Sequence, residues 1–131
     1  MSTRERIQPT LRRMAYAHAA TRTAVGIGLL VSPTAARAWV GDSADEGGGR
    51  VALQAFAIRD ALVGLGQLHS LRKGYPVRHW FQLALAFELT DALATIRQRR
   101  HLPDGPFPDA VALLALSGII GGAAVGFGLD E

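Results

Sequence analysis

The twenty residues from Ala110 to Leu129, AVALLALSGIIGGAAVGFGL, contain no charged side chain and a single serine. A helix of about this length crosses the roughly 30 Å hydrocarbon core of a bilayer. A helix on the surface of a soluble domain needs a polar face, and this segment offers none. The stretch therefore favours a chain that lies in a membrane, with a soluble helical bundle as the alternative.

Turn-forming residues divide the preceding part of the chain into three further apolar stretches. Ser32-Pro33 ends the first stretch, Gly47-Gly48-Gly49 precedes the second, and Gly74-Tyr75-Pro76 separates the second from the third. At 131 residues, the chain is long enough for one domain with a core and too short for two. We predict an all-α fold: one domain over residues 1–131, a four-transmembrane-helix bundle with short loops, whose helices cover approximately residues 12–31, 50–71, 78–97 and 108–129.

The beginning of the chain also imitates a secretory signal peptide. It has basic residues, the apolar run AVGIGLLV and an Ala36-Arg37-Ala38 triplet that resembles a cleavage site. Arg22 interrupts the apolar part, so we interpret this segment as the first helix of the bundle.

Basic residues are distributed unequally between the two ends of the predicted helices. The N-terminal segment and the second loop contain seven, and the opposite side contains five: Arg4, Arg6, Arg12, Arg13, Arg72, Lys73 and Arg78 against Arg37, Arg50, Arg97, Arg99 and Arg100. Because cytoplasmic segments carry an excess of Lys and Arg, this difference favours cytoplasmic N- and C-termini. The cluster at residues 97–100 argues for the opposite orientation.

Charged residues lie near the middle of three of the four predicted helices. Arg22 is central in the first, Arg59 and Asp60 in the second, and Glu88 and Asp91 in the third. An Arg or Asp at a helix centre costs about 2.5–3.5 kcal/mol on membrane insertion, so the second helix needs neutralising partners. Glu88 and Asp91 share a face because they are three residues apart. We expect Arg59 to pair with Glu88 or Asp91, and Asp60 to pair with Arg22.

Two further expectations follow from this arrangement. Arg59 and Asp60 are about 100° apart around the helix axis, so we do not expect them to pair with each other. Three acids face two arginines, so we expect Glu88 or Asp91 to hold a proton at neutral pH. His18 lies one turn before Arg22 on the same face. We define the predicted ionic network as His18, Arg22, Arg59, Asp60, Glu88 and Asp91.

The ionic network has two possible roles. Polar residues within membranes hold helices together, and they also form proton relays and ion paths. No second tier of charged residues leads from the network to both surfaces. A role in helix packing is therefore favoured over a role in transport.

Small residues recur at four-residue spacing on two of the predicted helices. Gly118, Gly122 and Gly126 form a doubled GxxxG pattern on the fourth helix, and Ala20, Ala24 and Gly28 form a small face on the first. Such residues let another helix backbone approach closely. We expect packing within the chain, with a homodimer or docking onto a larger membrane complex through the fourth helix as the alternative.

Other kinds of site find little support in the sequence. His69 and His79 lie level across a predicted hairpin and could hold haem or a metal, but histidines at this position are more often interfacial residues. The chain has no cysteine. Gly26-x-Gly28 and Gly64-x-Gly66 lack the third glycine and the strand of a dinucleotide site. Dispersed arginines without interleaved aromatics do not indicate nucleic-acid binding. We predict no enzyme, no cofactor and no metal, and a lipid bilayer as the surrounding medium.

A family resemblance extends over about residues 12–128. Its most specific features are Ile58-Arg59-Asp60 followed by Leu-Val-Gly-Leu-Gly, and Thr90-Asp91-Ala92 in the third helix; Gly-x-Gly-Leu-Leu, Ser-Pro and Trp39-Val40-Gly41 precede them. This order resembles the small four-helix integral membrane proteins of unknown function that are common in high-GC bacteria. The resemblance implies a multi-pass protein of the bacterial cytoplasmic membrane and no particular activity, and Glu88 is an addition to its pattern.

The sequence therefore predicts a structural or accessory membrane protein with a charged network at mid-depth. Two alternatives remain, a proton-coupled or small-solute transport unit and a quinone- or lipid-binding subunit of a membrane enzyme. Of these three roles, the structural or accessory one is preferred.

Overall fold

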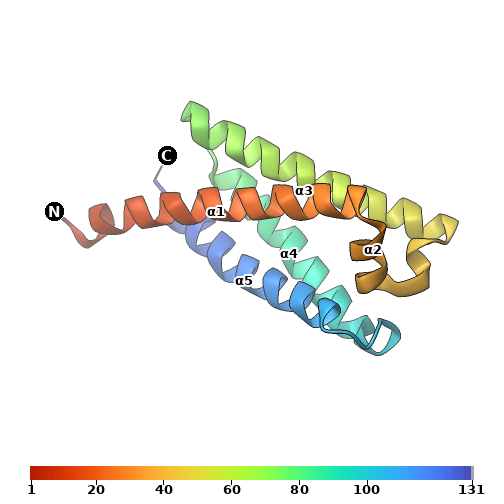
Figure 1. Cartoon of the computed structure of the whole chain (residues 1–131). Coiled ribbons are helices and arrows are strands. Elements are labelled where there is room, and N and C mark those ends of the chain that lie inside the picture. The colour runs from red at the N-terminus through yellow and green to blue at the C-terminus, as the bar shows by residue number, and fades with distance from the viewer. Residues whose placement is uncertain (131) are drawn as a thin grey trace.

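The computed structural model describes residues 1–130, and these residues are almost entirely helical. Four long helices run alternately up and down, with α1 packed along α3 and α4 packed along α5 (Figure 1). The α-helices are α1 (Thr3–Val31), α2 (Pro33–Val40), α3 (Gly47–Lys73), α4 (Arg78–Gln98) and α5 (Phe107–Gly128), with short 3₁₀ helices at Gly41–Ala44 and Arg99–His101. The prediction of an all-α chain is confirmed.

The first helix begins nine residues earlier than predicted. Ser2 and Glu5 form a capping box, in which the Ser2 hydroxyl accepts from the Glu5 backbone N–H and the Glu5 carboxylate accepts from the Ser2 backbone. This cap satisfies free backbone donors at the helix start, so the arginine-rich residues that follow continue as helix. At 29 residues, α1 is about 43 Å long, so its basic first turns project beyond the bundle (Figure 1).

The structure contains a short helix, α2, that the sequence analysis assigned to a loop. Ser32 ends α1, and its hydroxyl also caps α2 by accepting from the Ala35 backbone N–H. Pro33 occupies the first turn of α2, where its missing N–H leaves no donor unsatisfied. The chain bends by 99° between α1 and the α2 segment. The predicted number of four helices is therefore wrong by one, although four of the five are long.

Two helices, α3 and α5, are each long and apolar enough to cross a membrane. The bent pair of α1 and α2 makes a third when it is counted as one broken span. The remaining long helix, α4, is not apolar enough to count as a membrane span by composition. It carries Glu88 and Asp91 near its middle.

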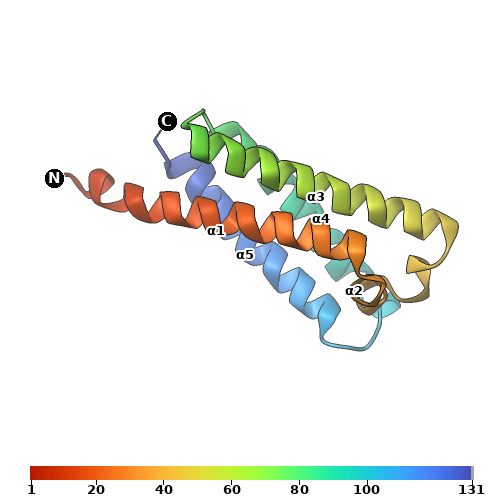
Figure 2. The same ribbon diagram turned by 45° about the horizontal axis from the view of Figure 1, so that its top comes forward.

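Two apolar clusters occupy opposite ends of the bundle. One joins Leu11, Leu71, Phe81 and Val125 where α1 and α4 begin and α3 and α5 end. The other surrounds Trp39 of α2, whose ring packs edge-on against Phe56 with centroids 4.9 Å apart. Trp39 is therefore buried inside the bundle. Figure 2 shows α2 at the end of the molecule opposite both termini.

Large apolar side chains are exposed on the outer faces of all four long helices. Exposed fractions of about half or more occur on each: Ile27 and Val31 of α1, Leu62 and Leu65 of α3, Leu89, Leu93 and Ile96 of α4, and Leu113, Ile120 and Phe127 of α5. The interior, in contrast, holds Arg22 and Asp60 in buried positions. Many large apolar side chains are therefore exposed while two charged side chains are buried, which is unusual for a soluble helical bundle.

α1 and α3 approach each other closely at Gly26 and Gly64. A Cβ atom on Gly26 would lie 2.6 Å from the Ala57 carbonyl oxygen and 2.9 Å from Ala61 Cα. A Cβ atom on Gly64 would lie 2.7 Å from the Thr23 backbone nitrogen. These two glycines therefore allow backbone contact between the helices, as small residues do at membrane helix interfaces.

The predicted packing face of the first helix is wrong. Ala20 and Ala24 are exposed, and a Cβ atom on Gly28 would meet nothing within 4 Å. The face that packs lies to one side of it and contains Ala19, Thr23 and Gly26. Small residues surround much of this helix, so four-residue spacing alone did not distinguish the two faces.

Candidate functional site

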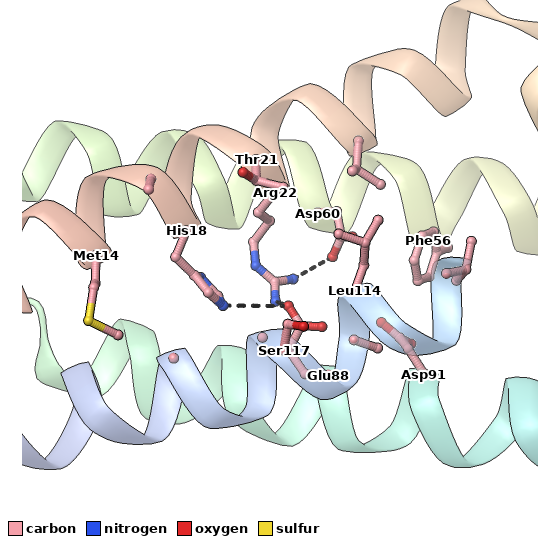
Figure 3. Close-up of a pocket in the computed structure, with 16 residues that line it drawn as sticks. Met14, His18, Thr21, Arg22, Phe56, Asp60, Glu88, Asp91, Leu114 and Ser117 are labelled. Atoms are coloured by element: carbon pink, nitrogen blue, oxygen red, sulfur yellow. Dashed lines mark hydrogen bonds and ion pairs between the residues drawn. The ribbon is translucent and has the colours of Figure 1, made fainter. Parts of the chain in front are cut away.

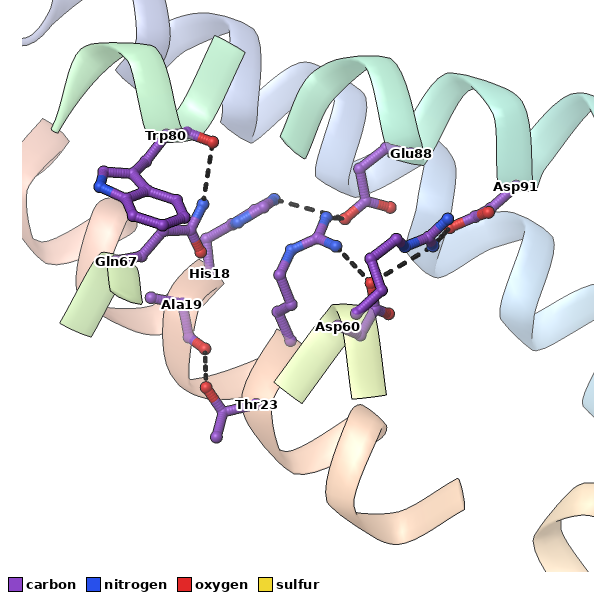
Figure 4. Close-up of polar contacts among 10 residues, drawn as sticks. His18, Ala19, Thr23, Asp60, Gln67, Trp80, Glu88 and Asp91 are labelled. Carbon is purple, nitrogen blue, oxygen red and sulfur yellow. Dashed lines mark hydrogen bonds and ion pairs between the residues drawn. The ribbon is translucent and has the colours of Figure 1, made fainter. Parts of the chain in front are cut away.

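The site is the ionic network, which lies between the two apolar clusters. α1 contributes His18 and Arg22, α3 contributes Arg59 and Asp60, and α4 contributes Glu88 and Asp91 (Figure 4). Five of the six predicted residues lie in one connected group of ion pairs, and the sixth, His18, lies with its Nε2 3.8 Å from Glu88 Oε1. α1, α3 and α4 contribute these residues, and α5 contributes none.

Arg22 is the centre of the network. Its side chain is 2% exposed, and Nη1 donates to Asp60 Oδ1 at 2.6 Å. Nη2 donates to Glu88 Oε1, so a single guanidinium connects α1 with both α3 and α4. Removing this side chain would leave two carboxylates in the interior without their nearest cation.

Arg59 joins α3 to α4 through Asp91. Its Nη2 donates to Asp91 Oδ2 at 2.7 Å, and the guanidinium carbon lies 4.6 Å from the ring centroids of both Phe56 and Phe87. An arginine held over aromatic faces in a dry environment gains cation–π attraction in addition to the ion pair. Phe56 lies three residues before Arg59, so its position on the same face was readable from the sequence, although the sequence analysis did not use it.

The expectation that Arg59 and Asp60 do not pair is wrong. Arg59 Nη2 lies 3.4 Å from Asp60 Oδ1. The Cα–Cβ directions of adjacent residues diverge, but an arginine side chain is long enough to bend back toward its neighbour. Asp60 thus contacts both arginines of the network.

Neither Glu88 nor Asp91 lacks a cation in the structure. Asp91 contacts Arg59, while Glu88 contacts Arg22 and lies 3.8 Å from Nε2 of His18. Gly118 of α5 makes room for Glu88, since a Cβ atom there would lie 2.8 Å from the Glu88 carboxyl carbon. The proton expected on one of these acids stays a prediction, because three acids still share two arginines.

The glycines predicted on the last helix face the inside of the bundle. A Cβ atom on Gly122 would lie 3.7 Å from His18 Nε2, and one on Gly126 would lie 3.2 Å from Gln82 Cγ. Gln82 Nε2 also donates to the Gly126 carbonyl at 2.9 Å. The doubled GxxxG pattern is therefore used against α1 and α4 of the same chain.

A cavity of about 340 Å³ adjoins the ionic network. Its inner wall contains Arg22, Asp60 and Glu88, and its outer part lies between α1 and α5, where Thr21 and Ser117 are exposed (Figure 3). Most of the remaining lining is apolar, including Met14, Val25, Val111 and Leu114. The sequence analysis did not predict this cavity, because its walls come from four separate helices.

The two histidines considered as haem or metal ligands lie on the surface. The His69 ring packs edge-on against Tyr75 with centroids 5.9 Å apart, and the His79 ring lies 5.8 Å from that of Trp80. Across residues 1–130, no three His, Asp or Glu side chains are grouped as metal ligands would be.

No family model, curated protein or solved structure matches this chain. The function proposed below therefore depends on the geometry of the fold and of the ionic network.

Proposed function

We propose that the chain is a multi-pass membrane protein in which all four long helices, α4 included, cross the bilayer. The exposed apolar side chains on every long helix support this arrangement. At 21 residues, α4 is about 31 Å long, which matches the hydrocarbon core. Its two central acids pair with arginines of α1 and α3 inside the bundle. The side of α4 that would contact lipid is therefore less charged than the composition of the whole helix indicates.

The proposed location is the bacterial cytoplasmic membrane, with both termini in the cytoplasm. The end of the bundle that contains the termini also contains Arg4, Arg12, Arg72 and Lys73, which supports this orientation. Membership of the four-helix family named above stays a prediction and supports the same location.

The role that we propose is non-enzymatic and structural or accessory: the ionic network fixes how α1, α3 and α4 pack. The observation that carries it is that every arginine and carboxylate of the network contacts an opposite charge on a neighbouring helix. Apolar clusters lie on both sides of the network along the bundle. An ion path would need polar groups in those places.

Partners of the chain other than lipid also remain proposals. Because the glycine face of α5 packs inside the bundle, a homodimer or a larger complex formed through this helix would use the opposite face. That face exposes Leu113, Leu116 and Ile120.

Reconstitution distinguishes this structural role from transport. We expect proteoliposomes under an imposed pH gradient to lose the gradient no faster than protein-free liposomes, measured with an entrapped pH-sensitive dye. A protonophore added at the end shows that the gradient was present. A protein-dependent proton flux that disappears in Glu88→Gln, and persists in the matched surface variant Glu46→Gln, would replace the structural proposal with a transport function.

A further inference from the structure

The cavity beside the ionic network has a composition that a purely structural role does not require. It combines an apolar lining with a polar inner wall, and its volume of about 340 Å³ falls within the range of small-molecule sites. Residues of four helices line it, and the lining includes the exposed residues Thr21 of α1 and Ser117 of α5 (Figure 3).

Small residues keep free the outer part of the cavity between α1 and α5, which we call the opening. Ala17 and Thr21 on α1 face Ser117 and Gly121 on α5, and a Cβ atom on Gly121 would still be 3.9 Å from the nearest side chain, His18. Larger residues at these four positions would close the gap between the two helices. In a bilayer the opening faces lipid, so a ligand would enter sideways from the membrane and not from water.

The depth of the cavity restricts the ligand. Its inner wall is formed by Glu88, which is central in α4, and by Arg22 of α1, which contacts Glu88. A phospholipid headgroup stays at the membrane surface, so it does not reach this depth without bringing its charge into hydrocarbon. The occupant must therefore be a lipid-soluble molecule whose polar group is small and uncharged.

Charge and hydrogen bonding restrict it further. The three acids of the network outnumber the two arginines, so no net positive charge is available for an anion such as a fatty-acid carboxylate. Donors are available, because Thr21 and Ser117 carry hydroxyls at the opening. Arg22 Nε is buried without an acceptor among residues 1–130. A neutral carbonyl oxygen matches this combination.

We infer that the cavity binds a lipid-soluble quinone, with its carbonyl-bearing ring beside Arg22 and His18 and its tail leaving between α1 and α5. The depth of the site rests on the proposed four-span arrangement. The lining, the volume and the charge balance are independent of that arrangement.

Binding is tested on purified protein in detergent with a short-chain benzoquinone as the probe. We expect a saturable rise in the melting temperature with quinone concentration. Ser117→Phe should fill the opening and weaken binding at least about tenfold, because a misfit of even one methylene group in an apolar pocket changes binding by about 10–200-fold. The matched control Leu113→Phe lies one turn away on the lipid-facing side of α5 and should bind as the unmodified chain does.

Two further measurements make the result decisive. Ala17→Phe narrows the same opening from α1, so it should reproduce the loss if Ser117→Phe does not fold. Oleate should not compete with the quinone. Equal competition by oleate, unchanged binding in both opening variants, or no saturable binding would each overturn the quinone site. Because the assay is done in detergent, an absence of quinone binding would count against the quinone site and would not test the number of membrane spans.

Discussion

Replacing Arg22 with methionine should lower the free energy of unfolding by about 3–5 kcal/mol, which is the cost of removing one partner from a buried ion pair. The Arg22 side chain is 2% exposed and contacts Asp60 and Glu88 on two different helices. Methionine is unbranched and uncharged and can replace the aliphatic part of the arginine side chain, so the substitution keeps that part of the packing and removes the cation. Unfolding in mixed detergent micelles, followed by circular dichroism, measures the loss.

Two comparisons separate loss of the charge from loss of the side chain. Arg12→Met, on the same helix, removes an exposed arginine that donates to the Leu71 carbonyl at 2.9 Å, and it should cost far less. The triple variant Arg22→Met, Asp60→Asn and Glu88→Gln removes the stranded charges together and should recover part of the loss, because neutral replacements of buried ion networks are often tolerated. Equal losses in Arg22→Met and Arg12→Met would contradict the central position of Arg22.

Gly26→Ala should be destabilising, although alanine is the better helix former by about 1 kcal/mol. The added methyl group would lie 2.6 Å from the Ala57 carbonyl oxygen, and α3 backbone atoms cannot rotate aside as a side chain can. Overpacking of this kind costs about 1–3 kcal/mol or more. The same unfolding assay gives the change in stability.

Gly28→Ala is the matched control for this position. It lies two residues further along α1, and its Cβ atom would meet nothing within 4 Å, so the substitution should be neutral or stabilising. The pair also tests which face of α1 packs. Loss of stability in Gly28→Ala but not in Gly26→Ala would restore the Ala20, Ala24 and Gly28 face that the spacing had suggested.

The membership and most of the pairing of the ionic network were predictable from the sequence. Arg59 and Asp60 are so costly in the middle of an apolar helix that partners had to be near the middle of other helices. Arg22, Glu88 and Asp91 were the charged residues available there. Helical geometry then separated the directions of Arg59 and Asp60, but it did not describe the reach of a flexible arginine, which is why their mutual contact was missed.

Other features were missed for two reasons: some follow local capping signals that the apolar pattern does not show, and one depends on tertiary structure. The start of α1 depends on a local cap at Ser2, whereas the apolar pattern begins only near residue 12. α2 was missed because Ser32 both ends one helix and begins the next. The cavity arises where four helices meet, so no single segment carries a signal for it.

The sidedness of the loops tests the central claim, that α4 crosses the membrane with its acids turned into the bundle. The chain has no cysteine, so single cysteines at Ser2, Ser43, Tyr75 and Gly105 can be labelled without a background. In spheroplasts, a membrane-impermeant maleimide should label Ser43→Cys and Gly105→Cys, and should label Ser2→Cys and Tyr75→Cys only after permeabilisation. Labelling of Tyr75→Cys and Gly105→Cys from the same side would show that α4 does not cross the membrane and would contradict the four-span bundle.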